Sequence, residues 1–197
     1  MQSDATRPTT AALAAILFGL AATPALAHVG TGHHASFMHG FAHPLGGFDH
    51  LAAMIAVGLW GGLAGGRRVW VWPLAFVVMM VVGGMLGRAG IELPMVEPAI
   101  ELSVVVLGLL VAMMVQVPVA LGAALVAVFA IFHGHAHGAE APETGWFGYA
   151  AGFVIATALL HTVGIGIARL MERSTGMVPV RAIGAATAVL GVVLLVK

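Results

Sequence analysis

The stretch His43-Pro-Leu-Gly-Gly-Phe-Asp49-His50-Leu-Ala-Ala-Met54 opens a long apolar run of the sequence. It places two imidazoles and a carboxylate where a membrane helix ordinarily carries no ionisable group. Ionisable side chains inside a bilayer are energetically costly, and they usually mark a pathway for an ion or a substrate. We therefore expect the other apolar segments to form a bundle of helices around this polar segment.

The composition identifies the class of protein. Hydrophobic residues make up 60% of the 197 residues and charged residues only 8%, with a mean hydropathy of +1.04. Because a soluble domain carries about 25% charged residues, this sequence cannot build a water-exposed surface. The formal net charge of zero argues against nucleic acid as a partner. With no cysteine, disulfides and thiolate metal sites are excluded, so imidazole, carboxylate and thioether remain as ligands for a transition metal.

Residues 1–27 have the pattern of a secretory signal peptide. A polar start is followed by an apolar core at 11–22 and by Thr23-Pro-Ala-Leu-Ala27, which combines a helix breaker with an Ala-x-Ala cleavage site. Cleavage is favoured over an uncleaved anchor because the core is shorter than the roughly 20 residues of a membrane span. His28 would then be the mature N-terminus, outside the cytoplasm.

Residues 28–42 form a polar, histidine-rich segment that precedes the membrane domain. Its glycines argue against a stable helix before Phe41. Imidazole is the commonest metal ligand, and a free amino group at His28 would add a second donor. The segment is therefore either a metal-collecting arm or a flexible leader.

Residues 43–197 predict an all-α, polytopic membrane bundle of six transmembrane helices. Loops expected on the cytoplasmic side hold five arginines, whereas Arg88 and Lys197 are expected outside, so both mature termini lie outside. Paired glycines at helical spacing predict close helix–helix contacts. The expected spans are Pro44–Gly65, Val69–Gly87, Pro98–Val115, Pro118–His133, Trp146–Ala168 and Val180–Val196. Four tryptophans near the span ends are expected to anchor the bundle at the lipid–water interface, namely Trp60, Trp70, Trp72 and Trp146.

The first candidate site lies at the start of the first span. If a helix begins near Pro44, His43 and His50 share one face, and Met54 continues that face one turn later. Asp49 lies about 100° around the helix from His50. The cluster predicts a binding site for a dehydrated cation. The alternative is a structural pair in which Asp49 accepts a hydrogen bond from an imidazole of another helix.

A second cluster closes the fourth span, in Phe132-His133-Gly-His-Ala-His137-Gly-Ala-Glu140. His133 and His137 are four residues apart, a spacing at which two histidines can share one metal ion, and Glu140 continues the same stripe. Gly134 and Gly138 weaken the helix, so a polar histidine-rich loop is the alternative.

Two further residues stand in apolar surroundings. His161 is either an interhelical hydrogen-bonding residue or a deeper ligand. Glu101 falls inside the third apolar run and needs a partner. Imidazole with carboxylate suits nickel, copper, zinc or cobalt, and does not distinguish among them. The candidate metal-binding residues are therefore His28, His43, Asp49, His50, Met54, Glu101, His133, His137, Glu140 and His161.

The pattern His43-Pro-x-x-Gly-x-Asp49-His50-x-x-x-Met54-x-x-x-Gly58 resembles the signature of the HupE/UreJ family of membrane nickel permeases. The run at 132–140 and the Leu-His-x-x-Gly element around His161 are similar to that family too. The resemblance covers the whole mature chain. It implies a secondary carrier of nickel, or also cobalt, in the bacterial cytoplasmic membrane, which supplies hydrogenase or urease. It also implies that His43, Asp49 and His50 handle the metal.

Transport is the function that we expect, with no enzymatic activity. The sequence contains no Gly-x-x-x-x-Gly-Lys-[Ser/Thr] motif, so nucleotide is not an expected partner, and flux would be driven by the membrane potential or by protons. The expected partners are a divalent transition metal ion and the lipid bilayer, and the oligomeric state stays open. The alternatives are an intramembrane zinc-dependent hydrolase, with Asp49, Glu101 or Glu140 as general base, and a metal-binding accessory protein.

Overall fold

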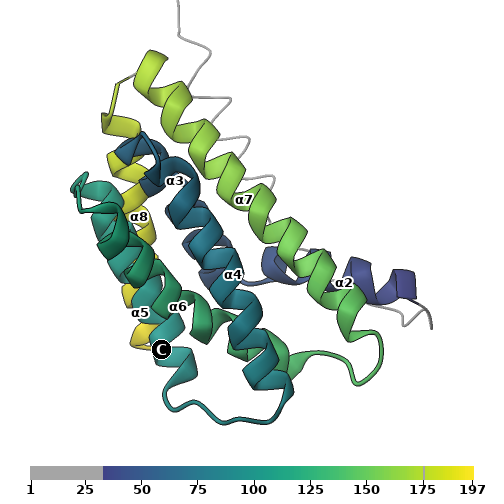
Figure 1. Cartoon of the computed structure of the whole chain (residues 1–197). Coiled ribbons are helices and arrows are strands. Elements are labelled where there is room, and N and C mark those ends of the chain that lie inside the picture. Colours follow the sequence, from purple (N-terminus) through teal and green to yellow (C-terminus); the bar gives the residue numbers. More distant parts are fainter. Residues whose placement is uncertain (1–32, 175) are drawn as a thin grey trace, which may run out of the picture.

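The computed structural model describes residues 33–174 and 176–197, so the predicted signal peptide and His28 lie outside the described residues. The described part is all-helical and contains no strand (Figure 1). Its helices are α2 (His33–Gly46), α3 (Phe48–Ala64), α4 (Arg68–Arg88), α5 (Val96–Ala112), α6 (Val119–Glu140), α7 (Trp146–Ser174) and α8 (Val178–Leu195).

Four helices, namely α4, α6, α7 and α8, are long and apolar enough to cross a membrane, and α2 with α3 forms a bent pair that would count as a fifth span. Helix α5 has 17 residues, fewer than the roughly 20 that a bilayer requires of a straight helix. The all-α class with several apolar helices is therefore confirmed. Each of the six expected spans has a helix in the structure, but the number that cross the bilayer stays a prediction.

The expected geometry of the first span is wrong. Helix α2 continues through Pro44 to Gly46, and α3 begins only at Phe48. Between them Gly47 has an extended backbone, with φ −110° and ψ 125°, and the two helices are bent by 83°. His43 and His50 therefore belong to different helices and do not share one helix face.

Helix α2 also starts at His33, earlier than the limit near Phe41 that its glycines suggested. Packing explains the difference. A Cβ atom at Gly40 of α2 would collide with the backbone of Tyr149 in α7, and one at Gly152 of α7 would collide with α2. Backbone contact with α7 therefore supports a helix for which the local sequence has only weak propensity.

Glycine contacts of the same kind join the remaining helices into groups. Helices α4 and α6 cross at Gly83 and Gly134, where a Cβ would overlap the backbone of the opposite helix, and α3 meets α7 at Gly58. Helix α5 meets α8 at Gly108. The small-residue prediction is confirmed at Gly83. The glycines of α6 do not break that helix, which stays regular to Glu140 and uses them to approach α4.

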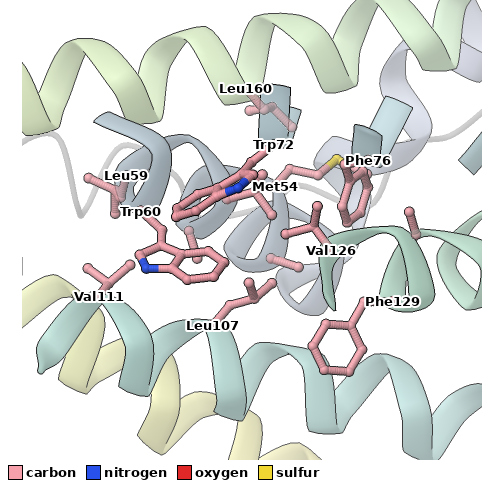
Figure 2. Packing of buried hydrophobic residues seen from close by; sticks show 14 of the residues in the cluster. Met54, Leu59, Trp60, Trp72, Phe76, Leu107, Val111, Val126, Phe129 and Leu160 are labelled. Atoms are coloured by element: carbon pink, nitrogen blue, oxygen red, sulfur yellow. The ribbon is translucent and has the colours of Figure 1, made fainter. Parts of the chain in front are cut away.

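Two tryptophans pack together near the end of the bundle that lies opposite the histidines. Trp60 of α3 and Trp72 of α4 are fully buried and stacked, with ring centroids 3.9 Å apart (Figure 2). The indole N–H of Trp60 donates to the Val115 carbonyl at 2.8 Å, and that of Trp72 donates to the Val119 carbonyl at 2.9 Å. The expectation that these two residues anchor the protein at the lipid interface is wrong, because both side chains are fully buried and their N–H groups bind carbonyls at the connection between α5 and α6. Trp70, with 64% of its surface exposed, retains that expected position.

Polar residues gather at the two opposite ends of the helix bundle. At one end, Arg68 contacts Gln116, and Nε of Arg181 donates to the Ala112 carbonyl at 2.9 Å. We call this end, which also holds Arg67, Arg169 and Arg173, the arginine end. The opposite end, which holds His43, His50 and residues 133–140, is called the histidine end.

Candidate metal centre

Four imidazoles from three helices form a continuous series at the histidine end. The ring centroid of His43 in α2 lies 4.7 Å from that of His137 in α6, which lies 4.4 Å from that of His50 in α3. The His50 ring lies 5.0 Å from the ring of His133, one turn before His137 on α6. The structure thus brings both predicted histidine clusters together.

A fifth imidazole lies deeper in the bundle. The Phe76 ring of α4 contacts both His133 and His161, with centroid distances of 5.5 Å and 5.2 Å. His161 is therefore the next imidazole along the helix axes, separated from the others by one phenyl ring. We call the five residues the histidine ladder, which consists of His43, His137, His50, His133 and His161.

The ladder begins with a group that has the dimensions of a metal site. Single ligand atoms of His43, His137 and Glu140 all lie within 4.8 Å of one another. The His43 Nε2 atom lies 3.5 Å from the Glu140 carboxylate, whose side chain is 59% exposed, whereas His137 is buried. A cation that arrives from water would meet the carboxylate first and the buried imidazole next. We call these three residues the mouth.

Asp49 does not point into the mouth but holds His50. Its Oδ1 accepts hydrogen bonds from the backbone N–H and from the ring Nδ1–H of His50, both at 2.8 Å. The Nε2 atom of His50 is buried and has no hydrogen-bond partner among the described residues. The carboxylate therefore fixes the imidazole with its Nε2 lone pair free, which is how outer carboxylates orient histidine ligands in metal sites.

Ser103 of α5 orients His133 in the same manner. Its hydroxyl donates to the Ile100 carbonyl at 2.6 Å, so its oxygen accepts from His133 Nε2–H at 2.9 Å. The Nδ1 atom of His133 then carries the lone pair, and it is buried without a partner in the described part of the chain. His137 has neither ring nitrogen hydrogen-bonded to a described residue.

His161 forms an interhelical hydrogen bond, the first of its two predicted roles, while its role as a ligand stays a prediction. Its Nδ1–H donates to the Met54 carbonyl of α3 at 2.7 Å, while Nε2 is buried and unpartnered among the described residues. The helices come close enough for this bond because Gly58 of α3 and Gly164 of α7 meet backbone to backbone. The glycine of the Leu-His-x-x-Gly element thus positions His161 against α3.

The other predicted ligands occupy different places. Glu101 is half-buried, outside the mouth, and forms no hydrogen bond or ion pair within residues 33–174 and 176–197. Met54 is fully buried beside His161. His28 lies outside the described residues.

Several contributing residues were missed because they look ordinary in an apolar helix. Ser103 and Phe76 touch ladder imidazoles, and their only sequence signal is their position within the spans. Tyr149 packs edge-on against the His43 ring at 5.8 Å, and its hydroxyl is buried with no described partner. A cavity of about 30 Å³ lies against Tyr149 and His137, and it has room for about one water molecule.

Comparison with known proteins identifies the family of the chain. The family described as HupE / UreJ protein matches residues 15–194, which include every residue of the ladder. The chain is 49% identical over 177 residues to Protein HupE of Rhizobium leguminosarum bv. viciae, a match that covers 89% of this chain and 93% of that protein. No solved structure gives a significant match. The resemblance seen in the sequence is thereby confirmed, and the chain belongs to the HupE/UreJ family.

Proposed function

We propose that the chain is a secondary transporter that moves nickel ions across the bacterial cytoplasmic membrane toward the cytoplasm, where they supply nickel enzymes such as hydrogenase or urease. One observation carries the proposal. Within the described residues, His50, His133 and His161 each have one ring nitrogen oriented by a hydrogen bond and the other buried without a partner. Buried polar atoms without a partner are costly, and a dehydrated cation would satisfy them.

The arrangement of the ligands supports movement rather than catalysis. A hydrolytic zinc site gathers three protein ligands around one ion and leaves one position for water. The mouth alone could hold one ion in this way, but further imidazoles continue from it through His50 and His133 toward His161, and a series of positions suits an ion that moves inward. The family match favours neither the hydrolase nor the other alternative over transport.

The direction of transport follows from charge. The arginine-rich loops predict that the arginine end faces the cytoplasm and that the mouth faces the periplasm. A membrane potential negative inside would drive a divalent cation inward with about 4.6 kcal/mol per 100 mV, twice the value for a single charge. Nickel is proposed as the substrate, and cobalt, copper and zinc share the ligand preferences of this site.

The experiment is accumulation of labelled nickel in cells that lack their own nickel uptake. Cells with the parent chain should accumulate nickel, and cells with His50→Ala should fall to the level of empty vector. His135→Gln is the matched control, because His135 lies outside the ladder and a glutamine amide can still donate to the Ile91 carbonyl that the imidazole contacts at 2.7 Å. Undiminished accumulation with His50→Ala, at equal protein levels, would contradict the proposal.

A further inference from the structure

A second group of metal-ligand atoms lies deeper than the mouth, between α3, α4 and α7. The Thr157 hydroxyl lies 3.3 Å from the sulfur of Met54 and 3.7 Å from the sulfur of Met80. All three side chains are buried, with exposed fractions of 0%, 0% and 2%. Two thioethers from different helices therefore converge on one hydroxyl inside the bundle.

His161 lies next to this group, one helical turn from Thr157 on α7, and its Nδ1–H is bound to the carbonyl of Met54. On α4, Phe76 precedes Met80 by one turn and packs on the His161 ring. The antiparallel helices thus pair Thr157 with Met80 and His161 with Phe76, while Met54 of α3 contacts both α7 residues.

Methionine is often a gap-filler in apolar packing, and packing alone would account for the two sulfurs. It does not account for His161 Nε2, which is buried with no hydrogen-bond partner among the described residues. A core residue with no further role would leave this lone pair uncompensated in apolar surroundings. A transition metal ion would bind this lone pair and can also accept thioether sulfur as a ligand.

We propose that His161 Nε2 and the sulfurs of Met54 and Met80 form a second, inner binding position for the transported cation. The mouth offers nitrogen and carboxylate oxygen, whereas the inner position offers nitrogen and sulfur. Because thioethers favour soft or borderline cations, the inner position rejects hard divalent ions such as Mg²⁺ and Mn²⁺ that the carboxylate of the mouth tolerates. This assignment rests on the proposed transport function. It adds to that function a step at which one class of cation is selected over another.

The test is nickel X-ray absorption of the purified full chain, carried without a polyhistidine tag and saturated with Ni²⁺. The parent should show sulfur neighbours of nickel in addition to nitrogen and oxygen. The sulfur signal should disappear in the double variant Met54→Leu with Met80→Leu, whose substitutions conserve volume. It should persist in Met38→Leu and Met85→Leu, controls whose side chains are 58% and 52% exposed.

The single variants Met54→Leu and Met80→Leu keep the test decisive if the double variant does not fold, since each should weaken the sulfur signal. A parent with only nitrogen and oxygen neighbours, or a sulfur signal that survives removal of both methionines, would overturn the inner position. In cells, the double variant should accumulate nickel with more inhibition by added Mn²⁺ than the parent shows. Equal inhibition of both would count against the selective role.

The two proposals fail in different ways. If the parent accumulates nickel in cells but shows no sulfur neighbours, the inner position is wrong and transport stands. If sulfur neighbours are present but the parent does not accumulate nickel, the inner position binds a cation and the transport function is wrong.

Discussion

Ser103 Oγ lies 2.9 Å from Nε2 of His133 and, because it donates to the Ile100 carbonyl, holds that imidazole with Nδ1 as its free nitrogen. Ser103→Ala should leave the fold intact but release the ring. Outer partners of histidine ligands typically contribute about 10–100-fold to metal affinity or activity, so nickel uptake at limiting nickel should fall by about that factor. Ser174→Ala, which removes an exposed hydroxyl bound within α7, is the control.

If nickel uptake in Ser103→Ala matched that of Ser174→Ala, the hydroxyl would have only a packing role. Thermal stability of both purified variants, measured by loss of tryptophan fluorescence signal, separates a lost ligand orientation from a damaged fold.

Asp49 orients His50 through its charge as well as its geometry. Asp49→Asn keeps one oxygen that can accept the Nδ1–H bond, whereas Asp49→Ala removes the acceptor. Since hydrogen bonds to a charged group are worth about 1.5–3 kcal/mol, uptake should decrease from parent to asparagine to alanine. Labelled nickel uptake measured for all three at equal expression tests this order. Equal loss in both variants would contradict this order, because it would mean that the hydrogen bond retained by asparagine does not help to orient the His50 ring.

Glu140 should matter most when nickel is scarce. Its exposed carboxylate at the mouth attracts a hydrated cation, so Glu140→Gln should lower the initial rate of uptake at limiting nickel and approach the parent rate at saturating nickel. Raising the ionic strength should narrow the difference, because salt screens exposed charges. Glu143→Gln, a nearby exposed glutamate outside the mouth, should behave as the parent does. An equal loss at all nickel concentrations would contradict an entry role.

The crossing of α4 and α6 should not tolerate a single added methyl group at its centre. In Gly134→Ala, the new Cβ would overlap the Met80 carbonyl of α4. Helix separation would shift His133 and His137 together, so both thermal stability and nickel uptake should fall. Gly166→Ala is the matched control, because a Cβ there has nothing within 4 Å, and it should leave both properties unchanged. A fully active Gly134→Ala would show that the helices can part without moving the ladder.

Much of this architecture follows from sequence patterns. Apolar length predicts the helices, and the spacing of His133, His137 and Glu140 predicts their stripe on α6, which the structure keeps. The pattern failed at Gly47. A Gly-Gly pair two residues after a proline is compatible with either a continuous or a broken helix, and the packing of α2 on α7 favours the break.

The small polar residues that contact the ladder imidazoles and the buried methionines could not be predicted from the sequence, for a different reason. Ser103 and Thr157 are ordinary small polar residues of apolar helices, and they gain a role only when another helix brings a ring nitrogen or a sulfur to them. Likewise, Trp60 resembles an interfacial anchor until its indole N–H is seen to reach the Val115 carbonyl. Contacts between side chains of different helices depend on the tertiary structure, so the pattern along one helix does not predict them.

The glycine contacts divide the bundle into blocks, and the ladder lies on the boundary between two of them. Helices α2, α3 and α7 form one block, which carries His43, His50 and His161, while α4 and α6 form the other, which carries His133 and His137. An ion bound at this boundary would be held by residues of both blocks at once. The two blocks could then separate only when the ion is released, so ion release and block separation would be coupled.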